Sequence, residues 1–246
     1  MRRSFGSVVL MAALAALMMC SGAQASTNGS SISIAFARDE PAGAGCALDP
    51  STAVGAPGYE SANWVNEMLN KGTDSVSVAR DDKGVAATTG ASVTWSSNNT
   101  WASMGRGENN NNFDGGFGPN FDLMTGYLDT SSRHDGTFDV VTITNLPADI
   151  AAGYSVVLYT LGGVRGRFAL YTVNGTTLSL SPGGDDNGVD NTPKNDDYHQ
   201  ALGDPTFGDA AFGNYMVFPG LSGDVSIQAT PVNFRAVLNA VQIIKN

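Results

Sequence analysis

The chain has 246 residues, with 13 Lys and Arg against 23 Asp and Glu, and its formal net charge is −10 at pH 7. This excess of acidic residues argues against nucleic acid as a partner, because a duplex binder needs a basic face to neutralise phosphates. The sequence shows no catalytic motif and no phosphate-binding glycine loop, and its 2 histidines are too few for a three-histidine zinc site. Function must therefore be argued from fold class, compartment and candidate binding residues.

Residues 1–25 have the three regions of a secretory signal: a basic start, an apolar run and a small-residue end at Ala25. We expect cleavage after Ala25 and a secreted protein, either extracellular or periplasmic. The apolar run is too short for a comfortable membrane span, so we expect no membrane-spanning segment. Lipidation of Cys20 is the alternative, although Met19 stands where a small residue usually precedes such a cysteine.

Cleavage would remove two basic residues and no acidic residue, which changes the formal charge from −10 to −12. Cys46 would then be the single cysteine, so no internal disulfide could form. Residues 26–30 have the composition of a polar linker. We expect residues 31–246 to form one domain, because a chain of this length is ample for one β-sandwich with a continuous core.

Alternation of apolar and polar residues predicts strands throughout the chain after the linker. The clearest block is residues 138–175, where short alternating runs are separated by a Leu-Pro turn and end at Asn174-Gly175. The predicted strands are residues 31–37, 76–78, 91–95, 140–145, 154–161, 167–173, 210–218, 224–230 and 236–244. The best helix candidate is short, residues 60–69. These patterns predict an all-β protein, and the economical arrangement is a two-sheet antiparallel β-sandwich.

Several segments resemble the galactose-binding-like jelly rolls, the β-sandwich fold of many secreted bacterial carbohydrate-binding modules. The segments are residues 31–36, 63–66, 123–129, 146–147, 154–159, 171–175 and 238–244. Each is a strand or turn pattern, and none is a motif of binding residues. The resemblance implies a jelly-roll fold, a secreted setting and a tendency to bind glycans, often beside a structural calcium ion.

Glycan recognition needs an aromatic surface for the sugar ring beside rigid polar groups for its hydroxyls. Trp101 offers this combination in a polar loop, with loop anchoring as the alternative role, whereas Trp64 and Trp95 fit core packing better. Arginines in the turn near residue 165 have a second interpretation as edge charges that block aggregation. The candidate ligand-binding residues are Trp101, Asn98, Arg106, Arg165, Arg167, Tyr198 and His199.

The acidic loop of residues 182–208 is the best place to look for a cation, because calcium prefers several carboxylate and carbonyl oxygens. Its spacing fails the helix-loop-helix calcium pattern, since Val189 occupies a ligand position. A solvated surface loop is therefore the alternative interpretation. The candidate metal ligands are Asp185, Asp186 and Asp190, with a second pair at Asp39 and Glu40 directly after the first predicted strand.

These observations predict a secreted, non-catalytic protein that binds a polysaccharide or glycan, with calcium as its possible structural cofactor. Two alternatives stay open. The first is an extracellular structural or adhesion protein with a protein partner at the cell surface. The second is a jelly-roll polysaccharide lyase or hydrolase, for which Tyr198, His199 and Gln200 supply suitable residue types. Adjacent residues on a strand point to opposite faces, so this adjacency alone argues little for catalysis.

Overall fold

The fold is taken from a computed structural model, which describes residues 30–36, 47–67, 72–82, 84–103, 111, 113–131, 139–162, 167–181, 196–203 and 212–246. The predicted signal sequence, Cys46 and all but the last residue of the predicted linker lie outside these ranges. No helix in the described ranges is long and apolar enough to cross a membrane.

The described residues form fourteen strands and three short helical segments. The strands are β1 (Ser31–Phe36), β2 (Val65–Glu67), β3 (Gly72–Asp82), β4 (Val85–Ser97), β5 (Asn99–Ala102), β6 (Gly126–Ser131), β7 (Asp139–Thr144), β8 (Tyr154–Tyr159), β9 (Phe168–Val173), β10 (Thr176–Leu180), β11 (Tyr215–Leu221), β12 (Val225–Asn233), β13 (Arg235–Leu238) and β14 (Ala240–Lys245). The helical segments are η1 (Phe113–Gly116), α1 (Pro119–Leu123) and α2 (Ala148–Ala151).

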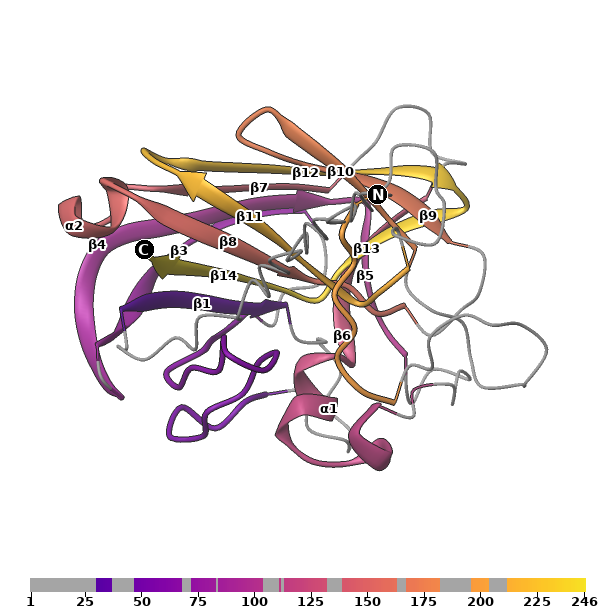
Figure 1. The fold of residues 1–246 in the computed structure, drawn as a ribbon, viewed down its shortest axis with the longest axis horizontal. Helices are drawn as coiled ribbons and strands as arrows, with labels where there is room; N and C mark the ends of the chain where they lie inside the picture. Colours follow the sequence, from indigo (N-terminus) through magenta and orange to yellow (C-terminus); the bar gives the residue numbers. More distant parts are fainter. Residues whose placement is uncertain are drawn as a thin grey trace, which may run out of the picture.

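Most strands belong to one large sheet with the order β10-β9-β12-β7-β4-β3-β1-β14-β8-β11, and β2 pairs with β1 (Figure 1). All pairs in this sheet are antiparallel except β1 with β2. The two ends of the sheet also meet, because Ser181 directly after β10 forms a parallel bridge with Phe212 before β11. The sheet therefore curls into a shape close to a barrel.

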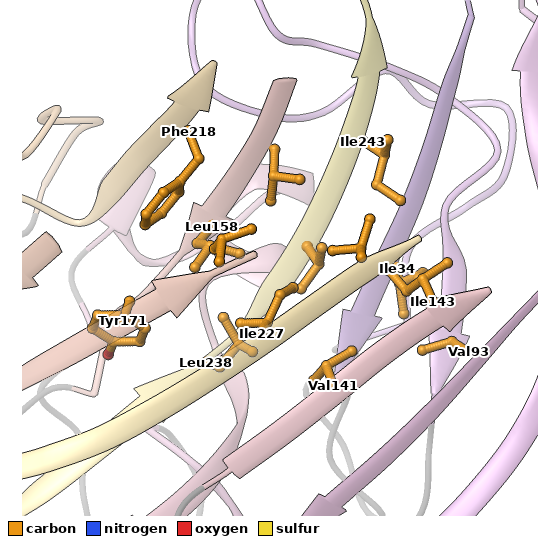
Figure 2. Close-up of a cluster of buried hydrophobic side chains, with 14 of the residues drawn as sticks. Ile34, Val93, Val141, Ile143, Leu158, Tyr171, Phe218, Ile227, Leu238 and Ile243 are labelled. Atoms are coloured by element: carbon orange, nitrogen blue, oxygen red, sulfur yellow. The ribbon is translucent and has the colours of Figure 1, made fainter. Parts of the chain in front are cut away.

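The main core lies inside this curled sheet, where alternate residues of each strand point inward. On β9, for example, Ala169, Tyr171 and Val173 are buried while the residues between them are half-buried. Figure 2 shows how side chains from distant strands meet in this core. The labelled residues are Ile34, Val93, Val141, Ile143, Leu158, Tyr171, Phe218, Ile227, Leu238 and Ile243.

A second apolar layer covers the outside of β1, β14, β8 and β11. Residues on both faces of β1 are buried, which explains why all six of its positions are inaccessible to solvent. Trp64, Phe113 and Phe121 belong to this second cluster, together with Tyr159 of β8 and Tyr215 of β11. In Figure 1, α1 and the described loop of residues 47–64 lie on the same side of β1.

A separate three-stranded sheet has the order β13-β6-β5. Its inner face contributes Leu128, Ala236 and Leu238 to the main core. Asn239 joins this sheet to the large one, because its side-chain amide donates to the carbonyl of Gly126 while its backbone N–H donates to the carbonyl of Tyr159. The three-stranded sheet therefore closes one part of the main core, and Tyr127, Asp129 and Val237 on its opposite face are also buried.

The expectation of a mostly antiparallel all-β protein is confirmed. The jelly-roll sandwich type is not confirmed, because one large curled sheet dominates and the second sheet has only three strands. The helix candidate at residues 60–69 is not helical over its described part, residues 60–67, since Ser61 forms a β-bridge with Val54 and β2 follows at Val65–Glu67. The predicted strand at residues 236–244 is two strands, which Asn239 separates.

Candidate functional site

The candidate site is the outer face of the three-stranded sheet, which faces away from the main core. The pairing register aligns Trp101 with Tyr127, Asn99 with Asp129, and Val237 with Asp129. Paired residues and residues two apart on a strand share a face of the sheet. The outer face therefore carries Asn99, Trp101, Tyr127, Asp129, Arg235 and Val237.

The aromatic part of this face is formed by Trp101 on β5 and Tyr127 on β6. Tyr127 is buried, while Trp101 is half-buried and reaches the edge of the site. Thr100 and Ala102, which alternate with Trp101, are buried on the inner face. This alternation corrects the expectation that Trp101 lies in a loop, because the segment is a short strand whose other face is packed.

An ion pair lies beside the aromatic residues. Arg235 on β13 forms a salt bridge through its Nη1 with Oδ2 of Asp129 on β6. The Asp129 side chain is 1% exposed, whereas that of Arg235 is 40% exposed. The pair therefore runs from the buried centre of the outer face to its solvent-accessible edge, where the guanidinium can contact a ligand.

Arg167 borders the same face from the start of β9. Its Nη1 donates to the carbonyl of Gly162 at 2.9 Å, and the residue is 6% exposed. A Cβ on Gly162 would lie 2.5 Å from Nη1 of Arg167 and 3.0 Å from Cγ1 of Val237. A side chain at this position would displace the Arg167 guanidinium from its place beside Val237.

This arrangement combines a partly exposed indole ring, two guanidinium groups, a buried carboxylate and an amide. Such a set can stack on one face of a ring-shaped ligand and donate hydrogen bonds to its oxygen atoms. It lacks the separated carboxylates that glycoside hydrolysis uses, since Asp129 is the single carboxylate among the described residues of this face.

The structure places two of the predicted ligand-binding residues, Trp101 and Arg167, at the three-stranded sheet. Trp101 and Arg167 border the outer face, and the half-buried Asn98 lies immediately before β5. Arg106 and Arg165 lie outside the described residues.

Tyr198 and His199 have a different setting from Trp101. The Tyr198 ring packs against Phe113 with a centroid distance of 4.7 Å, and its hydroxyl donates to Oδ1 of Asn120 at 3.1 Å. Burial raises its pKa well above the ordinary tyrosine value. The backbone N–H of His199 donates to Oδ1 of Asn214, and the carbonyl of His199 accepts the backbone N–H of Asn214, which directly precedes β11. We conclude that Tyr198 packs against the second apolar layer.

The sequence-based candidates did not include Tyr127, Asp129 or Arg235. Tyr127 and Asp129 alternate with Leu128 in residues 123–129, a segment that entered the sequence analysis as a strand pattern without binding residues. This alternation was the available signal for a polar outer face. The partner of Asp129 is 106 residues away in the sequence, so nothing local marks Arg235 as its counterpart.

The predicted metal ligands Asp39, Glu40, Asp185, Asp186 and Asp190 lie outside the described residues. Within the described parts of the chain, no group of three or more His, Cys, Asp or Glu side chains is placed to hold a metal ion. Among the acidic side chains that the structure describes, Asp122 on α1 has a pKa that burial raises from 3.8 to about 6. Asp122 therefore does not belong to the outer face, which is formed by β5, β6 and β13.

Comparisons with protein-family models, with curated proteins and with solved structures found no match to this chain. The site must therefore be interpreted from its own residues.

Proposed function

We propose that this chain is a secreted, non-catalytic carbohydrate-binding protein and that the outer face of the three-stranded sheet is its binding surface. The observation that carries the proposal is the partly exposed Trp101 on the same face as the Asp129–Arg235 pair. Sugar rings present apolar C–H surfaces that stack on aromatic rings, and their hydroxyls pair with charged and amide groups.

The composition of residues 1–25 supports the secreted setting. A galactose-binding-like relationship and a structural calcium ion in the loop of residues 182–208 belong to the same proposal. Both rest on the sequence patterns, because that loop is outside the described residues except at its 196–203 segment. Calcium is therefore a variable in the experiment and is not required by the geometry of the outer face.

The test is a glycan-array screen of residues 26–246 with and without calcium. Trp101→Ala should weaken binding at least tenfold, because it removes the ring on which the sugar stacks. Phe117→Ala is the matched control, since Phe117 is an exposed aromatic residue, at 74%, that directly follows η1 and does not belong to the three-stranded sheet. Binding that depends on Phe117 and not on Trp101 would contradict the assignment of the site.

Every glycan that binds should also be assayed for new reducing ends and for unsaturated products. Product formation would overturn the non-catalytic proposal and favour a lyase or hydrolase.

If no glycan binds, a group of exposed apolar residues favours the alternative that the protein binds another protein. Val232 and Phe234 are 49% and 53% exposed where β12 meets β13, and Phe234 has a left-handed φ of 62°. Bulky residues seldom adopt this conformation, so it is unusual at an exposed phenylalanine.

A further inference from the structure

Arg167 differs from every other cation in the described part of the chain. Arg80 and Lys245 both pair with Asp149, and Arg235 pairs with Asp129. Among the residues that the structure describes, no carboxylate lies within ion-pair distance of Arg167. Arg167 is also the most buried of these cations, at 6% exposed.

A buried guanidinium without an anion is unfavourable, because burial removes hydration that no opposite charge replaces. A guanidinium has five N–H donors arranged as a planar fork. In the described part of the structure, one hydrogen bond to the carbonyl of Gly162 uses this capacity. The remaining donors match the geometry of a carboxylate or a sulfate, which arginine binds through two parallel hydrogen bonds.

The position of Arg167 connects it to the proposed glycan surface. A Cβ on Gly162 would contact both Nη1 of Arg167 and the Val237 side chain, so these two groups are neighbours. Val237 pairs with Asp129 on the outer face. Trp101 lies on β5, on the other side of β6. Two strand spacings separate β5 from β13, or about 10 Å. The strands that carry Trp101 and Val237, the neighbour of Arg167, are therefore within the length of one oligosaccharide of each other.

We propose that Arg167 binds the oxyanion of an acidic glycan, so that the ligand of the outer face is a polysaccharide carrying carboxylate or sulfate groups. This inference rests on the proposed function and narrows it to a class of substrate. The ion-paired Asp129 explains why a second cation is needed. Asp129 neutralises Arg235, whereas no carboxylate among the described residues neutralises Arg167, so Arg167 is the cation of this face that we expect to pair with an anionic ligand.

The experiment compares glycans that differ only in charge. Polygalacturonate is compared with its methyl ester, and dextran sulfate with dextran, by isothermal titration calorimetry on residues 26–246. We expect at least tenfold tighter binding to one acidic member than to its neutral counterpart. The pair that shows the difference identifies the oxyanion as a carboxylate or a sulfate.

Three variants test the role of Arg167 itself. Arg167→Met should abolish the preference for the acidic glycan, and Arg167→Lys should restore part of it. Arg80→Met is the matched control, because it removes an arginine that is bonded to Asp149 outside this face. It should leave the preference unchanged. Equal loss in Arg80→Met and Arg167→Met would overturn the inference.

Folding is checked in the same samples by thermal unfolding. Arg167→Met should keep or raise the melting temperature, since it replaces a buried cation by an apolar side chain of similar length. If the variant does not fold, the wild-type protein gives the decisive result. Its melting temperature should rise with galacturonate or sulfate and stay constant with galactose, and the absence of any rise would overturn the inference.

The outcomes separate the two proposals. Binding that depends on Trp101 but is equal for charged and neutral glycans would overturn the role of Arg167 and leave the carbohydrate-binding function in place. A failure to bind any glycan would overturn both.

Discussion

The Tyr159 hydroxyl on β8 donates a hydrogen bond to Oε1 of Gln242 on β14 at 3.0 Å, at the boundary between the large sheet and the second apolar layer. The same hydroxyl accepts the backbone N–H of Ala56 at 3.2 Å. Gln242 in turn donates through Nε2 to the carbonyl of Tyr59 at 2.7 Å. This buried network fixes the covering loop against the outside of the sheet.

Tyr159→Phe should therefore destabilise the protein, because it leaves the Ala56 N–H and the Gln242 oxygen without a buried partner. We expect a loss of about 1–3 kcal/mol in the free energy of unfolding, measured by urea denaturation. Tyr59→Phe is the control in the same aromatic cluster, since the Tyr59 hydroxyl makes no hydrogen bond to the described residues. Equal effects of the two substitutions would show that the network contributes nothing.

Closure of the large sheet depends on a close backbone approach at Gly213. A Cβ at this position would lie 2.4 Å from the backbone nitrogen of Ala201 and 2.6 Å from the carbonyl oxygen of His199. Both atoms belong to the backbone segment that bonds with the start of β11, because Ala201 donates to the carbonyl of Tyr215. The clash cannot be relieved by rotating a side chain.

Gly213→Ala should destabilise the fold by about 3 kcal/mol or more, at the upper end of the cost of overpacking. Gly90→Ala provides the comparison, because a Cβ on Gly90 would meet nothing within 4 Å. Its effect should stay within about 1 kcal/mol. Thermal unfolding of both variants checks this, and a Gly213→Ala protein as stable as Gly90→Ala would contradict the closed arrangement.

Much of the fold could be predicted from the sequence, because alternation is strong where a strand has one buried face. The strands β1, β7, β8, β9 and β12 agree closely with the predicted runs. The strand β10 was missed, since its first two residues are exposed threonines. The Asn174-Gly175 pair was the available signal, and its φ values of 47° and 86° form the tight turn between β9 and β10.

Sheet order and closure could not be predicted, because they depend on contacts between distant segments such as Ser181 with Phe212. The candidate site shows the same limit. Trp101 and Arg167 were candidates from residue type and context, and their role in binding stays a prediction. Asp129 and Arg235 were missed because their pairing arises only when β6 and β13 become neighbours.

The pH dependence of stability should carry a contribution from Asp122. Burial raises the pKa of its carboxyl from 3.8 to about 6 in the folded protein. Between these values the folded state holds a proton that the unfolded state has released. The free energy of unfolding should therefore fall as pH rises through this window, and deprotonation is complete in both states above it. Because Asp122 is partly exposed, solvent screening should keep the change below about 1 kcal/mol.

Asp122→Asn should remove this decline, which is measured by urea denaturation at several pH values across the window. Asp149→Asn should instead remove a loss of stability that occurs as pH falls. Arg80 and Lys245 hold the pKa of Asp149 well below its usual range. The stability from these contacts is present above the unfolded pKa and is lost as pH falls below it. A decline with rising pH that persists in Asp122→Asn would assign the effect to another group.

The last prediction concerns how salt affects the binding of acidic glycans. Apart from the predicted signal, the chain carries a formal charge of −12, which follows from the −10 of the whole sequence after two basic residues are removed. This charge repels a polyanion over a Debye length, which is about 30 Å at 0.01 M salt and about 10 Å at 0.1 M. The contact with Arg167 is short and buried, so salt screens it less. The affinity for the acidic glycan should therefore rise as salt increases from about 0.01 M to about 0.1 M. Calorimetry with polygalacturonate or dextran sulfate, whichever binds, measures this change. The affinity for a neutral glycan should stay constant. A steady fall with salt is the behaviour of an exposed basic patch, and it would count against the buried Arg167 as the group that binds the anion.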